Sequence, residues 1–357
     1  MPDLPTRRLA TEREARTCLL LGAGASAGSD FKLPVMTNFF RQSDLDRRPE
    51  LHDLLKTLFP NVSQSQYNLE DVLGFLDLSR HRAKAWGPVG AVDHGLLERC
   101  YDETLALVSE RLAIPDGGVC SAHQKLAEQL GRQDSVVSLN YDLIADRALA
   151  GLRVTEQNAF PHDRVEKVSS LLGDATMWGI TPPSLTVQEQ SGGFLLKLHG
   201  SLDWLSCPNL ICTRSSFVHS PSKGAGNQQG QMAGDPCRAC GTGLATVLIP
   251  PVARKRIEEH SRLSVLWSLA LRELTQATTW VLIGLSLAPT DFELRWLLQQ
   301  AYYLRAKKPL DLDVVNPNQD AFDRAIQYVP VPRSAVRRYQ LLSDYVSRGH
   351  ADLAGHR

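Results

Sequence analysis

The stretch CLLLGAGASAGSD, from Cys18 to Asp30, joins an apolar run to a glycine-rich turn. An apolar run that stops abruptly at glycine is typical of a strand covered on both faces of a parallel sheet. Glycines at that point let backbone amides approach an anion, and the start of a following helix adds partial positive charge. The turn therefore predicts a phosphate-binding site, although close strand-to-helix packing explains the glycines equally well. The residues concerned are Gly22, Ala23, Gly24, Ala25 and Ser26.

Three more runs have the same character: SVVSLNYD from Ser135, WVLIGLSL from Trp280 and LDLDVVNPN from Leu310. Helical patterns lie between them, and the one after the third run opens with Thr290 three residues before Glu293, the spacing of a capping box. Because strand and helix alternate, the fold class is α/β with a doubly wound parallel sheet.

The composition narrows the class of protein. The chain has 357 residues, with 39 Lys plus Arg against 39 Asp plus Glu, so no net charge draws it to nucleic acid or to an anionic membrane. No apolar run reaches the roughly 18 residues of a membrane span, and the first residues lack the apolar core of a secretory signal. We therefore expect a cytoplasmic protein with no membrane association and no direct nucleic-acid signal.

Two segments break the strand-helix alternation. Residues 35–120 read as helical and predict an insertion, whereas residues 206–243 are rich in Ser, Gly, Gln, Asn and Cys and cannot bury much. The expected division is a sheet domain of residues 1–34, 121–205 and 244–330, the helical insertion 35–120, a small module 206–243, and a C-terminal helix or tail 331–357.

The small module contains four cysteines, as C-x4-C (Cys207 and Cys212) and then C-x2-C (Cys237 and Cys240). Two such pairs can approach one tetrahedral metal ion, in a segment too polar to fold without one. Four thiolates leave no open coordination position, so the sequence predicts a structural zinc rather than a catalytic one. Four free thiols in a loop are the simpler alternative.

Polar residues follow each predicted strand, where ligands sit in open parallel sheets. At this point the chain resembles the Sir2 (sirtuin) superfamily. GAGAS resembles its NAD-binding glycine motif, and NYD with Asn140 and Asp142 its N-x-D motif. HGS at His199 resembles its catalytic histidine motif. GLS, with Gly284 and Ser286, resembles its G-T-S motif, and Asn316 the later Asn that contacts the adenosine ribose.

The resemblance implies a Rossmann-like domain that binds NAD as substrate, a zinc-ribbon module at the four cysteines, and cleavage of the bond between nicotinamide and ribose. Independently, His199 can accept a proton near neutral pH and the Asn140 amide can orient ribose or water. Alone, His199 would be a structural imidazole and Asn140 a turn residue. Together with the other motifs, they are the predicted catalytic pair.

Departures from the protein-deacylating branch favour another subgroup. The peptide-binding signature after the second cysteine pair is missing, while NYD, KLHGSLDW and LIPP resemble the prokaryotic Sir2-like group of antiphage defence, whose members hydrolyse NAD. We expect an NAD glycohydrolase; a deacylase or ADP-ribosyltransferase and a non-enzymatic NAD or ADP-ribose sensor are the alternatives. Because unrestrained NAD hydrolysis would drain a cell, we expect restraint by a homo-oligomer or by a defence partner such as an ATPase or nuclease.

Overall fold

A computed structural model describes residues 16–86, 93–131, 134–150, 194–209, 211–212, 233–250, 261–306 and 308–347. Expectations for the remaining residues, including the first residues of the sheet domain and the middle of the small module, lie outside this part of the chain. No helix in the described ranges has the length and apolar character needed to cross a membrane.

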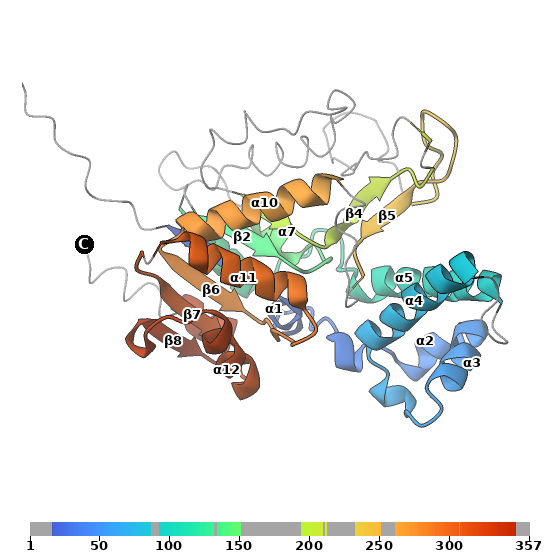
Figure 1. Cartoon of the computed structure of the whole chain (residues 1–357), viewed down its shortest axis with the longest axis horizontal. Helices are drawn as coiled ribbons and strands as arrows, with labels where there is room; N and C mark the ends of the chain where they lie inside the picture. The colour runs from blue at the N-terminus through green and yellow to red at the C-terminus, as the bar shows by residue number, and fades with distance from the viewer. Residues whose placement is uncertain are drawn as a thin grey trace, which may run out of the picture.

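Six parallel strands form the central sheet in the order β3-β2-β1-β6-β7-β8 (Figure 1). The strands are β1 Thr17–Leu21, β2 Ser135–Ser138, β3 Leu195–Lys197, β6 Thr279–Ile283, β7 Asp311–Val315 and β8 Val336–Tyr339. Counted along the chain within this sheet, the order is 3-2-1-4-5-6, the Rossmann arrangement, whose ligand crevice lies where the order reverses. The predicted α/β fold class is confirmed, and the reversal falls between β1 and β6.

Alternate strand residues face opposite layers of helices, as a doubly wound fold requires. Leu20 and Leu282 face the layer built from α10 (Ser261–Gln276), α11 (Phe292–Leu304) and α12 (Gln319–Tyr328). Leu19 and Val281 face the layer built from α6 (Ser121–Glu128), α7 (Ile144–Ala150) and the helical turn at residues 342–347. Burial on both faces explains why these strands read as continuous apolar runs.

Four helices between β1 and β2 form a separate cluster, which Figure 1 shows beside the sheet. They are α2 (Gln42–Asp46), α3 (Pro49–Leu58), α4 (Leu69–Trp86) and α5 (His94–Leu112), with short 3₁₀ turns at Met36–Asn38 and Gln64–Gln66. The cluster has its own core, in which Phe39, Leu55 and Leu76 are buried. Tyr141, which follows β2, is also part of that core. The predicted domain boundaries themselves stay a prediction.

A second, two-stranded antiparallel sheet pairs β4 (Gly200–Ser206) with β5 (Ala245–Leu248). The cysteine-bearing module lies between the end of β4 and the start of β5, because Cys207 follows β4 directly and β5 begins soon after Cys240.

The C-terminal region differs from the expected helix or tail. Val336–Tyr339 forms β8, which pairs in parallel with β7 and completes the sheet, and a helical turn follows at 342–347. The sequence VRRY gives no strand signal because β8 is an edge strand with no fully buried residue, so it needs no apolar run.

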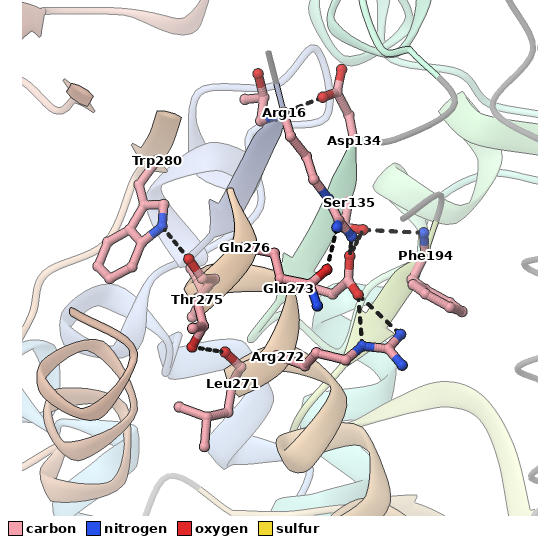
Figure 2. Close-up of polar contacts among 12 residues, drawn as sticks. Arg16, Asp134, Ser135, Phe194, Leu271, Arg272, Glu273, Thr275, Gln276 and Trp280 are labelled. Carbon is pink, nitrogen blue, oxygen red and sulfur yellow. Dashed lines mark hydrogen bonds and ion pairs between the residues drawn. The ribbon is translucent and has the colours of Figure 1, made fainter. Parts of the chain in front are cut away.

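The amino ends of the strands are closed by a buried polar network (Figure 2). Figure 2 shows Arg16, Arg272 and Ser135 converging on the carboxylate of Glu273, which is fully buried. Arg305, also buried, donates to carbonyls at the end of α10, among them Leu274 O at 3.3 Å. At this end of the sheet the buried charges of Glu273 and Arg305 thus have partners within the protein.

Candidate functional site

A cavity of about 650 Å³ lies at the opposite, carboxyl ends of the strands. Loops after β1, β2, β3, β6 and β7 contribute to its wall, as the reversal of strand order predicts. The structure brings together at this cavity every predicted catalytic and NAD-binding residue except Ala25, which is buried and does not line it. The ones that line the cavity are Gly22, Ala23, Gly24, Ser26, Asn140, Asp142, His199, Gly284, Ser286 and Asn316.

The turns after β1 and after β6 contact each other at the wall of this cavity. A Cβ atom added at Gly24 would lie 2.8 Å from the backbone of Gly284, and one added at Gly284 would lie 2.0 Å from Ala25 N. Gly284 also has a φ of +63°, a conformation that other residues rarely adopt. The glycines therefore allow the β1 and β6 turns to touch, which is the packing role that the sequence left open.

The backbone amides of the glycine turn are largely engaged. Gly22 N donates to Ile283 O, Gly24 N to Gly284 O and Ala25 N to Gly22 O, each at 2.9 Å. Helix α1 (Ala23–Ala27) is five residues long, so its dipole is small. The turn thus offers an anion fewer amides than its glycine-rich sequence suggests.

Asn140 and Asp142 tie the loop after β2 to this turn. The Asn140 Nδ2 group donates to Gly22 O and to Ser26 Oγ, both at 2.9 Å, and Ser26 Oγ donates to Asp142 Oδ2 at 2.7 Å. Asp142 Oδ1 accepts from Ile144 N at 3.0 Å at the start of α7. Because Nδ2 is engaged, the Asn140 carbonyl oxygen is the atom of that amide with capacity left for a ligand.

Lys197 was not predicted from the sequence, but it binds the backbone of the loop that follows β2. Its Nζ donates to Asp142 O at 2.6 Å and to Tyr141 O at 3.3 Å, and pairs with Asp146 Oδ2 at 2.9 Å. Burial raises the pKa of Asp146, and the ammonium group of Lys197 acts in the opposite direction. Lys197 is itself buried, and KLHGS gave a signal only through its place two residues before His199.

His199 lies at the turn between β3 and β4 and is almost fully buried. Its ring is flanked by Tyr141 at 6.4 Å and Trp267 at 6.2 Å between ring centroids. Trp267 Nε1 donates to Leu198 O at 3.1 Å, and the Tyr141 hydroxyl donates to Ile249 O. Two anchored aromatic rings thus fix the imidazole at the cavity wall.

Asn316 and Ser286 line the β7 side of the cavity. Asn316 Nδ2 donates to Leu285 O at 2.8 Å, and its Oδ1 accepts from Asn318 N at 2.9 Å. Ser286 O accepts from Arg324 Nε at 3.0 Å, and Arg324 also lines the cavity. Arg324, on α12, was missed because nothing in the sequence links one helical arginine to the β6 turn.

The helical cluster supplies another part of the wall through Asn68, Leu69 and Glu70. Thr290 Oγ1 donates to Glu70 Oε1 at 3.1 Å across the two parts of the molecule. The expected capping box at Thr290 is wrong by one residue: Asp291 is the N-cap of α11, and its carboxylate accepts from Leu294 N at 3.4 Å. Thr290 is thereby available to contact α4.

The four cysteines converge as predicted, with their sulfur atoms all within 4.8 Å of one another. The Sγ atoms of Cys207 and Cys240 are 3.5 Å apart, and those of Cys212 and Cys237 are 3.9 Å apart. Zinc–sulfur bonds of about 2.3 Å in a tetrahedron place sulfurs roughly 3.8 Å apart. Contacts with Thr242 lower the pKa of Cys240 to about 6, while burial raises the pKa of Cys207. The set fits a closed, structural zinc site.

Comparison with known proteins gives the following picture. No protein-family model and no curated protein sequence matches the chain. Among solved structures, the chain is similar to a Sir2 homologue in complex with NAD, at 15% identity over 96% of this chain and 91% of that one, with a TM-score of 0.47. It is also similar to a mutant Sir2 homologue in complex with 2'-O-acetyl ADP-ribose, at 16% identity over 96% and 95% of the chains and a TM-score of 0.42.

Proposed function

We propose that this protein is a Sir2-type NAD glycohydrolase, which cleaves NAD into nicotinamide and ADP-ribose. One observation carries the proposal: His199, Asn140, Ser286 and Asn316 come from four separate strand ends, in the order of the Sir2 motifs, and line a single cavity at the reversal of strand order. The cavity, at about 650 Å³, has a volume within the range of roughly 300–1,000 Å³ that small-molecule and cofactor sites have.

The reaction breaks the bond between ribose C1' and the nicotinamide ring nitrogen. Both bonding electrons go to the ring nitrogen, so a cationic group leaves as neutral nicotinamide. Water then forms the new bond to C1' and gives up a proton, for which the imidazole of His199 is the acceptor. The Asn140 carbonyl oxygen orients the water or a ribose hydroxyl, while Ser26 and Asp142 hold Asn140 in place.

The alternatives make different demands on the same cavity. A protein deacylase or ADP-ribosyltransferase requires a second substrate, so an acetyl-lysine peptide would accelerate nicotinamide release. A sensor of NAD or ADP-ribose would bind its ligand without consuming it. The missing peptide-binding signature favours hydrolysis over protein deacylation, and consumption of the ligand distinguishes hydrolysis from the sensor.

Nicotinamide release from NAD, followed by chromatography with and without an acetyl-lysine peptide, tests the proposal. We expect release without peptide, and a loss of about 10²- to 10⁴-fold in His199→Ala and in Asn140→Ala. His52→Ala, on α3 and outside the cavity, is the matched control. Unchanged turnover in both cavity variants with intact melting temperatures would overturn the assignment.

We further propose that the cysteine module folds around structural zinc. The segment on either side of the cysteines has little core of its own, with Leu205 and Leu244 packing against Cys207, Cys212 and Cys237. Chelation should therefore release about one zinc per chain, measured by metal analysis, and lower the melting temperature. Metal-free protein with unchanged stability would contradict this role.

Assembly is the proposed restraint on activity, with a second copy of this chain docking through α11. Phe292, Trp296, Tyr303 and Leu304 on this helix are each at least half exposed. The fifth residue of this helix that is exposed is Gln299, so its most exposed positions carry no charge, while Glu293 and Arg295 are partly buried. An antiparallel two-fold pairing would set Phe292 against the partner's Tyr303 and Trp296 against the partner's Gln299, a self-complementary register.

Light scattering after gel filtration tests this assembly. We expect a dimer or larger species that Trp296→Lys converts to monomer. Leu341→Lys is the control, because Leu341 is as exposed as Trp296 but lies beyond β8. A wild-type monomer would overturn the proposal.

We also propose a role in prokaryotic antiphage defence by NAD depletion, with an ATPase or nuclease as a possible class of partner. It rests on the resemblance of NYD, KLHGSLDW and LIPP to that subgroup. Cellular NAD should fall on phage infection of cells that express the protein and stay constant with His199→Ala. A fall in both would contradict it.

A further inference from the structure

The cavity has an uneven distribution of charge. Three carboxylates line it, those of Glu70, Asp142 and Asp291. Among the described residues of the wall, Arg324 is the one lysine or arginine. A ligand that carries two phosphates would meet repulsion from the carboxylates and attraction at a single place.

Arg324 is held beside the β6 turn rather than free to move in solvent. Its Nε donates to Ser286 O at 3.0 Å, while Asn316 Nδ2 donates to the preceding carbonyl, Leu285 O, at 2.8 Å. The side chain is partly buried, and within the described part of the chain its polar contact is the hydrogen bond to Ser286 O rather than an ion pair with a carboxylate. One nitrogen of the guanidinium is thus used for positioning, and its two terminal nitrogens keep their donors for a ligand.

The glycine turn is a weak source of positive potential here. The amides of Gly22, Gly24 and Ala25 donate within the protein, and α1 is only five residues long. A pyrophosphate would therefore lack much of the amide cradle that the GAGAS sequence suggests. The compensating charge has to come from elsewhere on the wall, and a fork of guanidinium donors suits phosphate oxygens.

We propose that Arg324 is the phosphate-binding residue of the cavity, which contacts the pyrophosphate of a dinucleotide or of ADP-ribose from the β7 side. This inference rests on the proposed function, and it assigns to a helical arginine the charge that the glycine turn supplies only in part. If Arg324 acted only as a clamp on Ser286, its loss would weaken every ligand equally, because the whole β6 turn would shift.

Calorimetric binding of ADP-ribose and of adenosine separates these possibilities, since adenosine has no phosphate. In Arg324→Gln we expect ADP-ribose affinity to fall about 10- to 100-fold, as for a lost hydrogen-bonded charge pair, with adenosine unchanged. The salt dependence of ADP-ribose binding should also become flatter. Arg333→Gln is the matched control, because Arg333 stacks on Phe322 and does not line the cavity.

Equal weakening of both ligands, or no weakening of ADP-ribose, would overturn the inference while leaving the proposed function intact. Failure of the wild-type protein to bind ADP-ribose or NAD would instead overturn the proposed function itself.

Discussion

The two ends of the parallel sheet are built from similar groups and do different things. At the amino end, Ser135 Oγ donates to Glu273 Oε2 at 2.8 Å. At the carboxyl end, Ser26 Oγ donates to Asp142 Oδ2 at 2.7 Å. Both carboxylates are buried and each is fixed by a serine. The first is enclosed by protein, whereas the second borders a cavity of about 650 Å³.

The difference lies in which groups complete each network. The carboxylate of Glu273 forms ion pairs with Arg16 and Arg272, so its negative charge is neutralised within the protein. The Asp142 carboxylate accepts hydrogen bonds from Ser26 Oγ and from a backbone amide. Asn140, which lines the cavity, has its Nδ2 group engaged and its carbonyl oxygen left for a ligand. A buried polar cluster therefore indicates a functional site only when the fold leaves some of its hydrogen-bonding capacity for a ligand.

The largest loss of stability should come from a side chain placed where the turns after β1 and β6 touch, at the carboxyl end of the sheet. Gly284→Ala places a Cβ atom 2.0 Å from Ala25 N at a positive φ, so we expect loss of folded protein in expression and circular dichroism. Gly74→Ala is the control, because no heavy atom lies within 4 Å of a Cβ there and the position is helical. A well-folded Gly284→Ala protein would refute the close contact.

The amino end should respond in stability and not in ligand affinity. Glu273→Gln leaves the buried Arg16 and the partly exposed Arg272 without their carboxylate, and breaking a buried pair costs about 3–5 kcal/mol of unfolding free energy. Denaturant unfolding measures this loss, and ADP-ribose affinity under native conditions should be unchanged. A parallel loss of affinity would mean that the two ends are coupled.

The two serines allow a matched test of the ends. Ser135→Ala and Ser26→Ala each remove one buried hydrogen bond to a carboxylate, at a cost of about 1–3 kcal/mol in unfolding free energy. Only Ser26→Ala should also lower nicotinamide release, because Asn140 donates to Ser26 Oγ. Equal turnover in both variants would show that Ser26 has no positioning role.

The smallest effect concerns the link between the carboxyl end and the helical cluster. Thr290→Val removes the hydrogen bond to Glu70 at 3.1 Å, which is partly exposed, and should cost about 0.5–1.5 kcal/mol in unfolding free energy. The KM for NAD should rise more than kcat falls, since Glu70 lines the cavity from the helical cluster and is not one of the proposed catalytic residues. Thr57→Val, on α3, is the control for loss of a threonine hydroxyl.

The sequence predicted some parts of the site well and others not at all. Asn140 follows a strand that burial on both faces makes apolar, so its position can be read from the pattern, whereas His199 is found through the resemblance of HGS to a Sir2 motif. Lys197 and Arg324 could not be found this way. A lysine or arginine in a sequence normally indicates a solvent-exposed position. The roles of Lys197 and Arg324 depend on partners far along the chain, Asp146 and Ser286.

By itself the sequence determined four of the six parallel strands (β1, β2, β6 and β7), the turn glycines and the spacing of the four cysteines, because each depends on local composition and short-range geometry. The tertiary structure alone decided that the edge strand β8 completes the sheet and that Thr290 contacts Glu70. It also decided which polar atoms the fold consumes: the amides of Gly22 and Gly24 are engaged, whereas the wall at Arg324 keeps its charge for a ligand. Hydrogen-bonding capacity is shared among distant segments, so only their packing shows what is left over.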